Sequence, residues 1–131
     1  MSIYKGEKLI SGSASASASA SAYPRPDWTH SVDINVEAAY IEGYTAPSNG
    51  MIVGWFHCNA SGHLIEMEIN HQTIIARART LSNGNTSWDG NVQCPVNKGD
   101  LIKLEATPSI SSNEVTGWLT FVPFIDSYTG N

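Results

Sequence analysis

The sequence has few charged residues, no basic cluster and no long apolar run. Only 15% of its 131 residues are charged, and 7 basic against 12 acidic side chains give a formal net charge of -5. Nucleic acids and anionic membranes both require clustered Lys and Arg, so neither is predicted as a partner. No apolar segment reaches the ~18 residues that a membrane-spanning helix needs, so membrane insertion is not predicted either.

Signals of export and of disulfide chemistry are also scarce. The first ten residues contain Lys5 and Lys8 but no apolar stretch after them, so the sequence predicts no secretory signal peptide. Only two cysteines are present, Cys58 and Cys94. Disulfides persist in oxidising compartments, so without an export signal we expect two buried, reduced thiols.

A low-complexity segment separates an N-terminal peptide from the rest of the chain. Residues 13–22 repeat Ser-Ala and offer no large side chain to bury, which favours a flexible linker. The alternative is a small-residue strand packed tightly in an assembly. Two prolines in Tyr23-Pro24-Arg25-Pro26 mark a boundary. The sequence therefore predicts an N-terminal arm, 1–26, and a head domain, 27–131.

The head domain is predicted to be all-β and to contain no helix. Apolar and polar residues alternate with the period of a half-buried strand, and turn residues recur every 8–12 positions, which is typical of an antiparallel β-sandwich. Asn70-His71 is a predicted hairpin tip, and Pro95 is expected at a bulge or sheet edge because it lacks an N–H. The expected strands cover 32–38, 51–58, 64–70, 73–81, 92–96, 101–107 and 114–124.

The last expected strand is apolar on both faces. Leu119 and Phe121 lie on one face, so something must cover the other. A neighbouring subunit would do so, since exposed apolar patches mark interfaces. The alternative is a central strand buried on both faces within one chain. The first reading predicts an oligomer interface made by Trp118, Thr120, Val122 and Phe124.

Residues of the types used in catalysis and metal binding occur, but without the required spacing. His57 and His63 flank a turn near Cys58, yet no second pair of zinc ligands accompanies them. The loop 85–90 lacks the late bidentate acid of a calcium loop. Glu66 and Glu68 share one strand face and indicate a solvated strip that blunts a sheet edge, not a glycosidase pair. We therefore predict no enzyme activity, no metal and no cofactor.

Trp88 is unusual because polar residues surround it in a predicted loop. A flat apolar ring beside amides and a carboxylate is what a sugar-binding site needs. The alternative is a tryptophan folded back over the rim of the core. The predicted ligand-binding residues are Asn85, Ser87, Trp88, Asp89 and Asn91.

Four segments, in order, resemble the trimeric jelly rolls of the complement-globular-head and tumour-necrosis-factor type. They are Ala46–Val53 (proline, turn, glycine, apolar strand), Ile65–Ile75 (a hairpin with asparagine at its tip), Val92–Leu104 (Gly99-Asp100 before an apolar strand) and Gly117–Phe121 (the closing strand). This resemblance implies a jelly-roll head that forms a homotrimer.

The order of the regions is similar to that of small fibre proteins of bacteriophages that infect gut bacteria. The peptide Ile3–Ile10 precedes low complexity and then the head, although a Ser-Ala tract replaces the collagen-like stalk of those proteins. The resemblance implies a virion protein that docks through its N-terminal segment and meets a host glycan or receptor with its head. A stand-alone carbohydrate-binding module or lectin and a hydrolytic enzyme are the alternatives.

Overall fold

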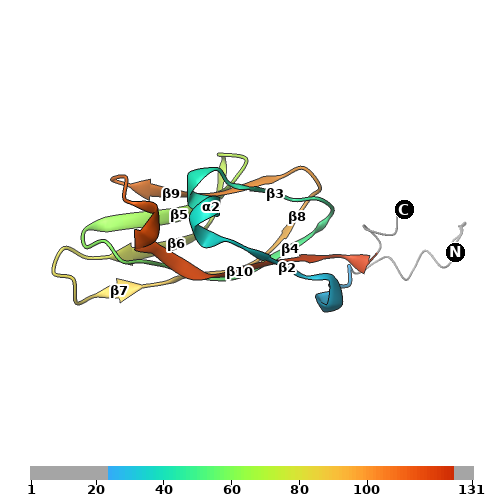
Figure 1. The fold of residues 1–131 in the computed structure, drawn as a ribbon, viewed down its shortest axis with the longest axis horizontal. Helices are drawn as coiled ribbons and strands as arrows, with labels where there is room; N and C mark the ends of the chain where they lie inside the picture. The colour runs from blue at the N-terminus through green and yellow to red at the C-terminus, as the bar shows by residue number, and fades with distance from the viewer. Residues whose placement is uncertain (1–23, 126–131) are drawn as a thin grey trace, which may run out of the picture.

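Two antiparallel sheets packed face to face form the domain in the computed structural model, which describes residues 24–125 (Figure 1). One sheet has four strands in the order β2-β10-β4-β8, and the other has five in the order β3-β9-β5-β6-β7. The predicted all-β sandwich is therefore confirmed. The predicted docking peptide and Ser-Ala linker lie outside the described residues. The strands are β2 (Val32–Ile34), β3 (Tyr44–Thr45), β4 (Gly50–Cys58), β5 (His63–Ile69), β6 (Thr73–Thr80), β7 (Ser87–Trp88), β8 (Gly90–Val96), β9 (Leu101–Thr107) and β10 (Val115–Pro123).

A short helix corrects the expectation that the head contains none. The strand expected over 32–38 stops at Ile34, and α2 (Val36–Ile41) follows. Asn35 begins this helix, because its side-chain oxygen accepts the Ala38 N–H at 2.8 Å. Single 3-10 turns, η1 (Trp28–His30) and η2 (Ser112–Glu114), precede β2 and β10. Within 24–125, no helix has the length and apolar character needed to cross a bilayer.

The core lies between the two sheets and is built from alternate residues of their strands. Phe56 of β4 and Phe121 of β10 are 0% and 1% exposed, and Ile65 and Met67 of β5 face them from the other sheet. Each such side chain contributes roughly 1.5–3 kcal/mol by leaving water. This burial decides which face of each strand points outward and can meet a ligand.

Several predicted turns and edges agree with the structure. Asn70 and His71 form the β5–β6 hairpin tip with positive φ angles of 55° and 56°, and Pro95 lies on the edge strand β8. The expectation that Glu66 and Glu68 blunt a sheet edge is wrong, since β5 is the middle strand of its sheet. Position in a sheet depends on strand order, which local alternation does not encode.

The turn before β9 is held by a carboxylate. Asp100 accepts hydrogen bonds from the Asn97 N–H at 2.8 Å and from Asn70 Nδ2 at 3.0 Å. These bonds favour the ionised form and lower the pKa of Asp100. A carboxyl group whose pKa falls on folding adds stability above its unfolded pKa, and this stability is lost as the pH falls through its folded pKa.

Asp100→Asn is therefore expected to lower the urea midpoint at neutral pH and to lower it less in acid. The two proteins should converge below about pH 4, where the unfolded aspartate begins to bind its proton. Urea melts of both proteins from pH 7 to pH 3 measure this. An unchanged difference across that range would show that the charge of Asp100 does not stabilise the turn.

Candidate functional site

The fold does not bring the five predicted ligand-binding residues together. Ser87 and Trp88 form β7 at the edge of the five-stranded sheet, where Trp88 lies opposite Arg79. Asn91 lies on β8, in the other sheet, opposite Trp55. Asp89 occupies the crossing between the two sheets, and Asn85 remains in the preceding loop. Trp88 is half-exposed, as a binding residue would be, but Asp89 contacts His57 and Asn91 lies opposite Trp55.

A pair of tryptophans stands on the outer face of the four-stranded sheet instead. Trp55 of β4 and Trp118 of β10 are directly opposite one another in the strand register. They are 40% and 50% exposed. Side chains in such a cross-strand pair start from Cβ atoms roughly 4.5–5.5 Å apart, so the two indoles stand side by side on this face. We call Trp55 and Trp118 the tryptophan pair.

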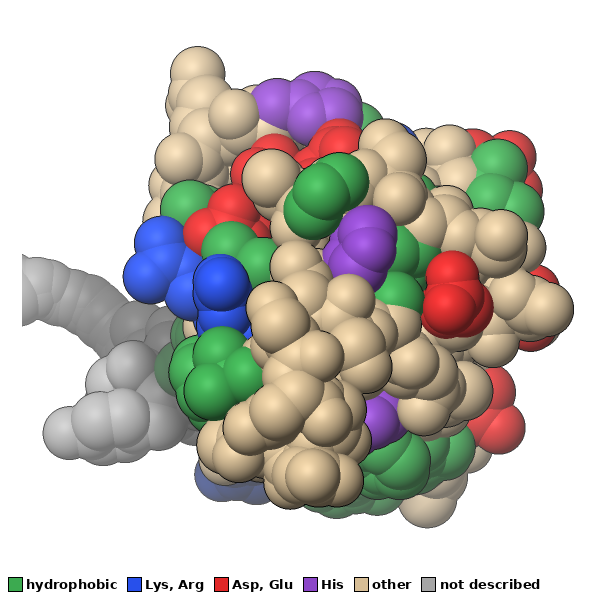
Figure 2. Space-filling view, turned by 90° about the vertical axis from the view of Figure 1, so that its left-hand side faces the viewer, with side chains coloured by type: hydrophobic (Ala, Val, Ile, Leu, Met, Phe, Trp, Pro, Cys, Tyr) green, Lys and Arg blue, Asp and Glu red, His purple; other side chains and the backbone are tan. Residues whose placement is uncertain are grey.

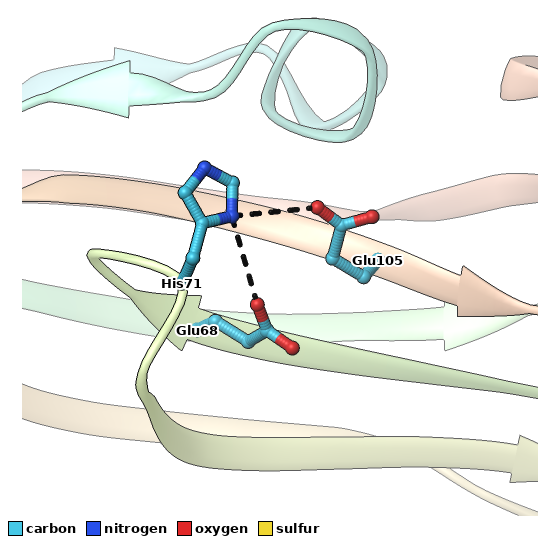
Figure 3. A group of neighbouring side chains, drawn as sticks. All are labelled: Glu68, His71 and Glu105. Atoms are coloured by element: carbon cyan, nitrogen blue, oxygen red, sulfur yellow. Dashed lines mark ion pairs between the residues drawn. The ribbon is translucent and has the colours of Figure 1, made fainter.

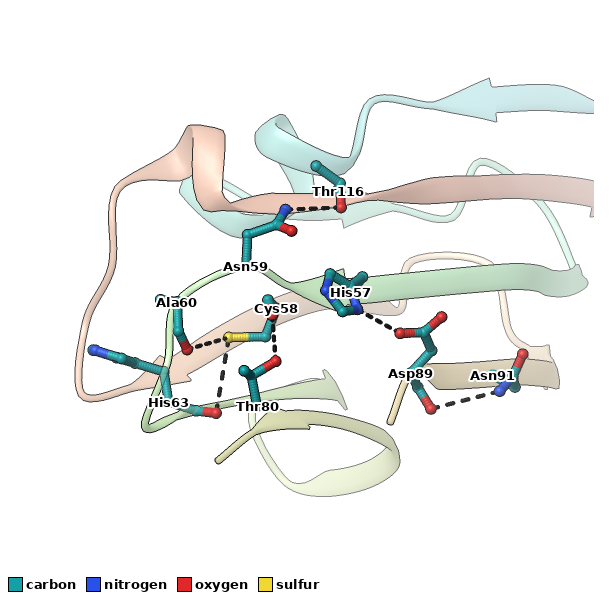
Figure 4. A network of polar contacts seen from close by, with 9 residues as sticks. All are labelled: His57, Cys58, Asn59, Ala60, His63, Thr80, Asp89, Asn91 and Thr116. Atoms are coloured by element: carbon teal, nitrogen blue, oxygen red, sulfur yellow. Dashed lines mark hydrogen bonds and ion pairs between the residues drawn. The ribbon is translucent and has the colours of Figure 1, made fainter. Parts of the chain in front are cut away.

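Polar side chains border the tryptophan pair toward β8 and toward the end of β4. Asn91 faces Trp55 from β8. His57 follows on the same face of β4, and its Nδ1 lies 2.6 Å from Asp89 Oδ1 (Figure 4). On the β10 side of His57, Thr116 accepts a hydrogen bond from Asn59 Nδ2 at 3.1 Å. Amide, imidazole, hydroxyl and carboxylate groups thus surround an apolar surface.

Two glycines fix the tryptophan pair in place. Gly54 precedes Trp55, and a Cβ on Gly54 would lie 2.0 Å from the carbonyl oxygen of Trp118. Gly117 precedes Trp118, and a Cβ there would lie 2.3 Å from the carbonyl oxygen of Trp55. Their φ angles, +139° and +151°, are also ones that other residues rarely adopt. Each glycine therefore packs against the backbone of the opposite tryptophan, and no larger residue could take its place without moving the strands apart.

The predicted oligomer interface is only partly open to a partner. Thr120 and Val122 are 2% and 0% exposed, and Thr120 Oγ1 lies 3.4 Å from Asp33 Oδ1. Phe124 is half-buried and bridges Pro26. Of the four predicted residues, Trp118 alone is exposed. The apolar surface available on this face is therefore concentrated at the tryptophan pair.

A groove continues the tryptophan pair past the edge of β10. It has a volume of about 340 Å³ and lies between β10 and the segment that joins β2 to α2. Trp118 and Thr116 form one side of it, and Asp33, Asn35 and Glu37 line the other. The groove places two carboxylates beside an exposed indole.

The outer face of the five-stranded sheet is charged and internally paired. Arg77 Nε lies 2.7 Å from Glu66 Oε2. His71 Nδ1 lies 3.9 Å from Glu68 Oε1 and 3.7 Å from Glu105 Oε2 (Figure 3). A metal ion could in principle be bound by side chains of the kinds found at Glu68, His71 and Glu105. However, the Lys103 ammonium lies 3.4 Å from Glu105 and already supplies a positive charge there. We interpret this cluster as an ion-pair network.

Cys58, His57 and His63 do not converge on a shared zinc site. The Cys58 thiol is buried, with Sγ 3.4 Å from the Ala60 carbonyl, and burial raises its pKa. His63 Nδ1 donates to the Pro108 carbonyl at 2.8 Å, while the His57 ring faces Asp89. Cys94 is half-buried and unpaired, so the prediction of reduced thiols is confirmed and full burial holds for Cys58 alone.

A second, more polar hollow lies at the end of the sandwich away from Pro24 and Ile125. Figure 2 looks onto this end, where uncharged polar side chains and backbone dominate. The hollow has a volume of about 500 Å³, and Asn59, His63 and Glu114 line it together with three serines. Its lining contains no Trp, Tyr or Phe side chain on which a sugar ring could stack.

No protein-family model, curated protein or solved structure matches this chain. The function is therefore argued from the residues and geometry of the domain.

Proposed function

We propose that the domain is a non-enzymatic module that binds glycans through Trp55 and Trp118. The observation that carries the proposal is the exposed tryptophan pair on a sheet face, bordered by Asn91, Thr116 and the His57–Asp89 pair. A sugar ring has one apolar face, which stacks on an indole, and hydroxyls at its edge, which need amide and carboxylate partners. The tryptophan pair and its polar border supply both.

The amount of exposed apolar surface favours a small ligand over a large protein partner. Each tryptophan carries roughly 200–250 Å² of surface and is about half exposed, so the pair offers roughly 200 Å². A stable protein interface buries about 800 Å² per partner. Thr120 and Val122, which would extend the patch along β10, are already buried.

The resemblance to trimeric jelly rolls and phage fibre heads enters here as part of the proposal. Strand order supports it: with the two-residue β7 set aside, the eight other strands change sheet at every connection except the β5–β6 hairpin, which suits two Greek keys. The bridge between Pro26 and Phe124 places both ends of the described chain together. An N-terminal arm docked to a virion would then leave the opposite end of the head free to meet a host surface.

Replacing either tryptophan of the pair is expected to abolish most glycan binding. Trp55→Ala and Trp118→Ala should each weaken binding roughly 10- to 100-fold, because truncating a central aromatic removes a hot spot. Trp88→Ala is the matched control, since Trp88 is 49% exposed but belongs to the other sheet. The effect is measured as binding of the parent protein and the three variants to a printed array of neutral, sialylated and sulfated glycans.

Three other outcomes would replace the proposal. Light scattering gives the molar mass of each protein, and a trimer that dissociates in Trp55→Ala or Trp118→Ala would make the tryptophan pair a subunit interface. Release of reducing ends from a bound glycan would identify a hydrolase. Equal loss of binding in Trp88→Ala would move the site back to the β7 edge.

A further inference from the structure

We infer that the site binds an uncharged oligosaccharide, which extends from the tryptophan pair into the groove beside Trp118, and that it rejects acidic glycans. This inference rests on the proposed glycan-binding function and specifies its ligand. It follows from the shape of the groove and from the placement of charged side chains around it.

The groove exists because β10 loses its neighbour halfway along. β2 pairs with Leu119, Thr120 and Phe121 only, so no strand among the described residues covers that side of β10 at 115–118. The chain turns into α2 instead, and the space of about 340 Å³ opens between them. A ligand stacked on Trp118 can therefore continue over the edge of the sheet.

The length of this path favours several sugar units. Asn91 on β8 and Asp33 on β2 stand at the two sides of the sheet, with Trp55 and Trp118 between them. Three strand-to-strand spacings of about 4.8 Å separate β8 from β2, or roughly 14 Å. This distance exceeds one sugar ring, so an oligosaccharide that lies across the strands can touch both tryptophans and the groove.

The charges along the path are negative. Asp33 and Glu37 are exposed in the groove, and Asp89 lies at the other side of the tryptophan pair. Asp33 Oδ1 lies 3.4 Å from Thr120 Oγ1, and Glu37 Oε1 lies 3.3 Å from Ser112 Oγ. Within residues 24–125, neither carboxylate forms an ion pair with a Lys, Arg or His side chain. Carboxylates in this setting accept hydrogen bonds from sugar hydroxyls but repel sugar carboxylates and sulfates.

The lysine and arginine residues within 24–125 lie away from the tryptophan pair and its groove. The Lys98 N–H donates to the side chain of Asn49, which directly precedes β4 and lies six residues before Trp55, or roughly 20 Å at the strand rise. Arg25 lies at the opposite end of β10, where its carbonyl accepts the Ile125 N–H. His57, the one basic ring beside the pair, faces Asp89. The remaining described cations, Arg77, Arg79 and Lys103, belong to strands of the other sheet.

Matched pairs of glycans test the inference. The probes are N-acetyllactosamine with its sialylated and sulfated forms, and methyl-esterified homogalacturonan with its de-esterified form. For each pair of glycans that binds, we expect the neutral glycan to bind more tightly than its acidic form. The difference in affinity should be roughly fourfold for each protein carboxylate within about 5 Å of the added sugar charge. The preference should shrink in about 1 M salt, where the screening length is about 3 Å.

A charge-neutral variant separates repulsion from shape. Asp33→Asn combined with Glu37→Gln keeps the size of both side chains and an oxygen that can accept a hydroxyl hydrogen bond but removes both charges. It should therefore raise the affinity for each acidic glycan relative to its neutral form, whatever it does to the neutral form itself. If an acidic glycan binds more tightly than its neutral form and its binding still requires Trp55, the inference is overturned while the proposed function stands. If neither Trp55→Ala nor Trp118→Ala weakens the binding of any glycan on the array, the proposed function itself is overturned.

Discussion

Gly54→Ala and Gly117→Ala are each expected to destabilise the domain by roughly 3 kcal/mol or more. Two costs combine at each position. The new methyl group would meet a backbone carbonyl oxygen at 2.0 Å in Gly54→Ala and at 2.3 Å in Gly117→Ala, and a carbonyl in a strand has no rotamer through which to move aside. The φ angles of +139° and +151° add backbone strain.

Gly99→Ala is the matched control for the backbone term. Gly99 also has a positive φ, +89°, but a Cβ there would meet nothing within 4 Å. Alanine at 99 should therefore cost only about 1 kcal/mol. Urea unfolding of the three variants and the parent measures the difference, and equal losses at all three positions would show that β4 and β10 are not held at close approach by their glycines.

The same variants connect stability to the site. If β4 and β10 are pushed apart, Trp55 and Trp118 no longer stand opposite one another, so glycan binding should fall in whatever fraction of Gly54→Ala remains folded. Gly99→Ala should bind as the parent does. The two glycines thus allow the close approach of β4 and β10 that sets Trp55 opposite Trp118.

Local alternation was sufficient to predict the long strands and the orientation of their side chains, but not the two-residue strands β3 and β7. The sequence places Met51, Val53 and Trp55 on one face of β4 and Trp118 on the outward face of the last strand, and the structure agrees. It does not indicate that β4 and β10 are neighbours, because they lie about 60 residues apart in sequence and their pairing is a long-range choice. The repeated Gly-Trp at 54–55 and 117–118 was the available signal.

The prediction around Trp88 shows the opposite difficulty. Ser87, Trp88, Asp89 and Asn91 are close in sequence, and their composition suggested one site. The chain changes sheets between Trp88 and Gly90, so neighbours in sequence turn to different faces. Alternation along one strand cannot reveal such a crossing.

The helix α2 was missed because one residue fits two patterns. Val32, Ile34 and Val36 alternate as a strand would, while Val36 and Ala39 have the three-residue spacing of a helix and are the buried residues of α2. A six-residue helix shows too few turns for its period to stand out. The capping residue Asn35 was the local signal that favoured the helix.

Phe56→Ala is expected to cost about 3–5 kcal/mol, because the ring is fully buried and its removal leaves a cavity between the sheets. The crossing residue Gly90 lies directly opposite Phe56 in the register. A Cβ on Gly90 would lie 2.3 Å from Phe56 Cζ, so glycine is required there by the ring and not by its own backbone. Gly90→Ala alone should cost about 1–3 kcal/mol by overpacking.

Gly90→Ala should therefore cost less in a protein whose Phe56 ring has been replaced by a shorter side chain. Phe56→Leu removes the end of the ring that Gly90 faces and keeps enough volume for the protein to stay folded. In the Phe56→Leu background the methyl group of Gly90→Ala enters space that the ring has left, so its cost should drop by about 1–2 kcal/mol. Urea unfolding of the parent, both single variants and the double variant closes the cycle. Additive losses would mean that the Phe56 ring does not determine where the chain crosses from the Trp88 edge to the sheet of the tryptophan pair. A large coupling would tie that crossing, and with it the position of Asp89 and Asn91 beside Trp55, to the packing of a single core ring.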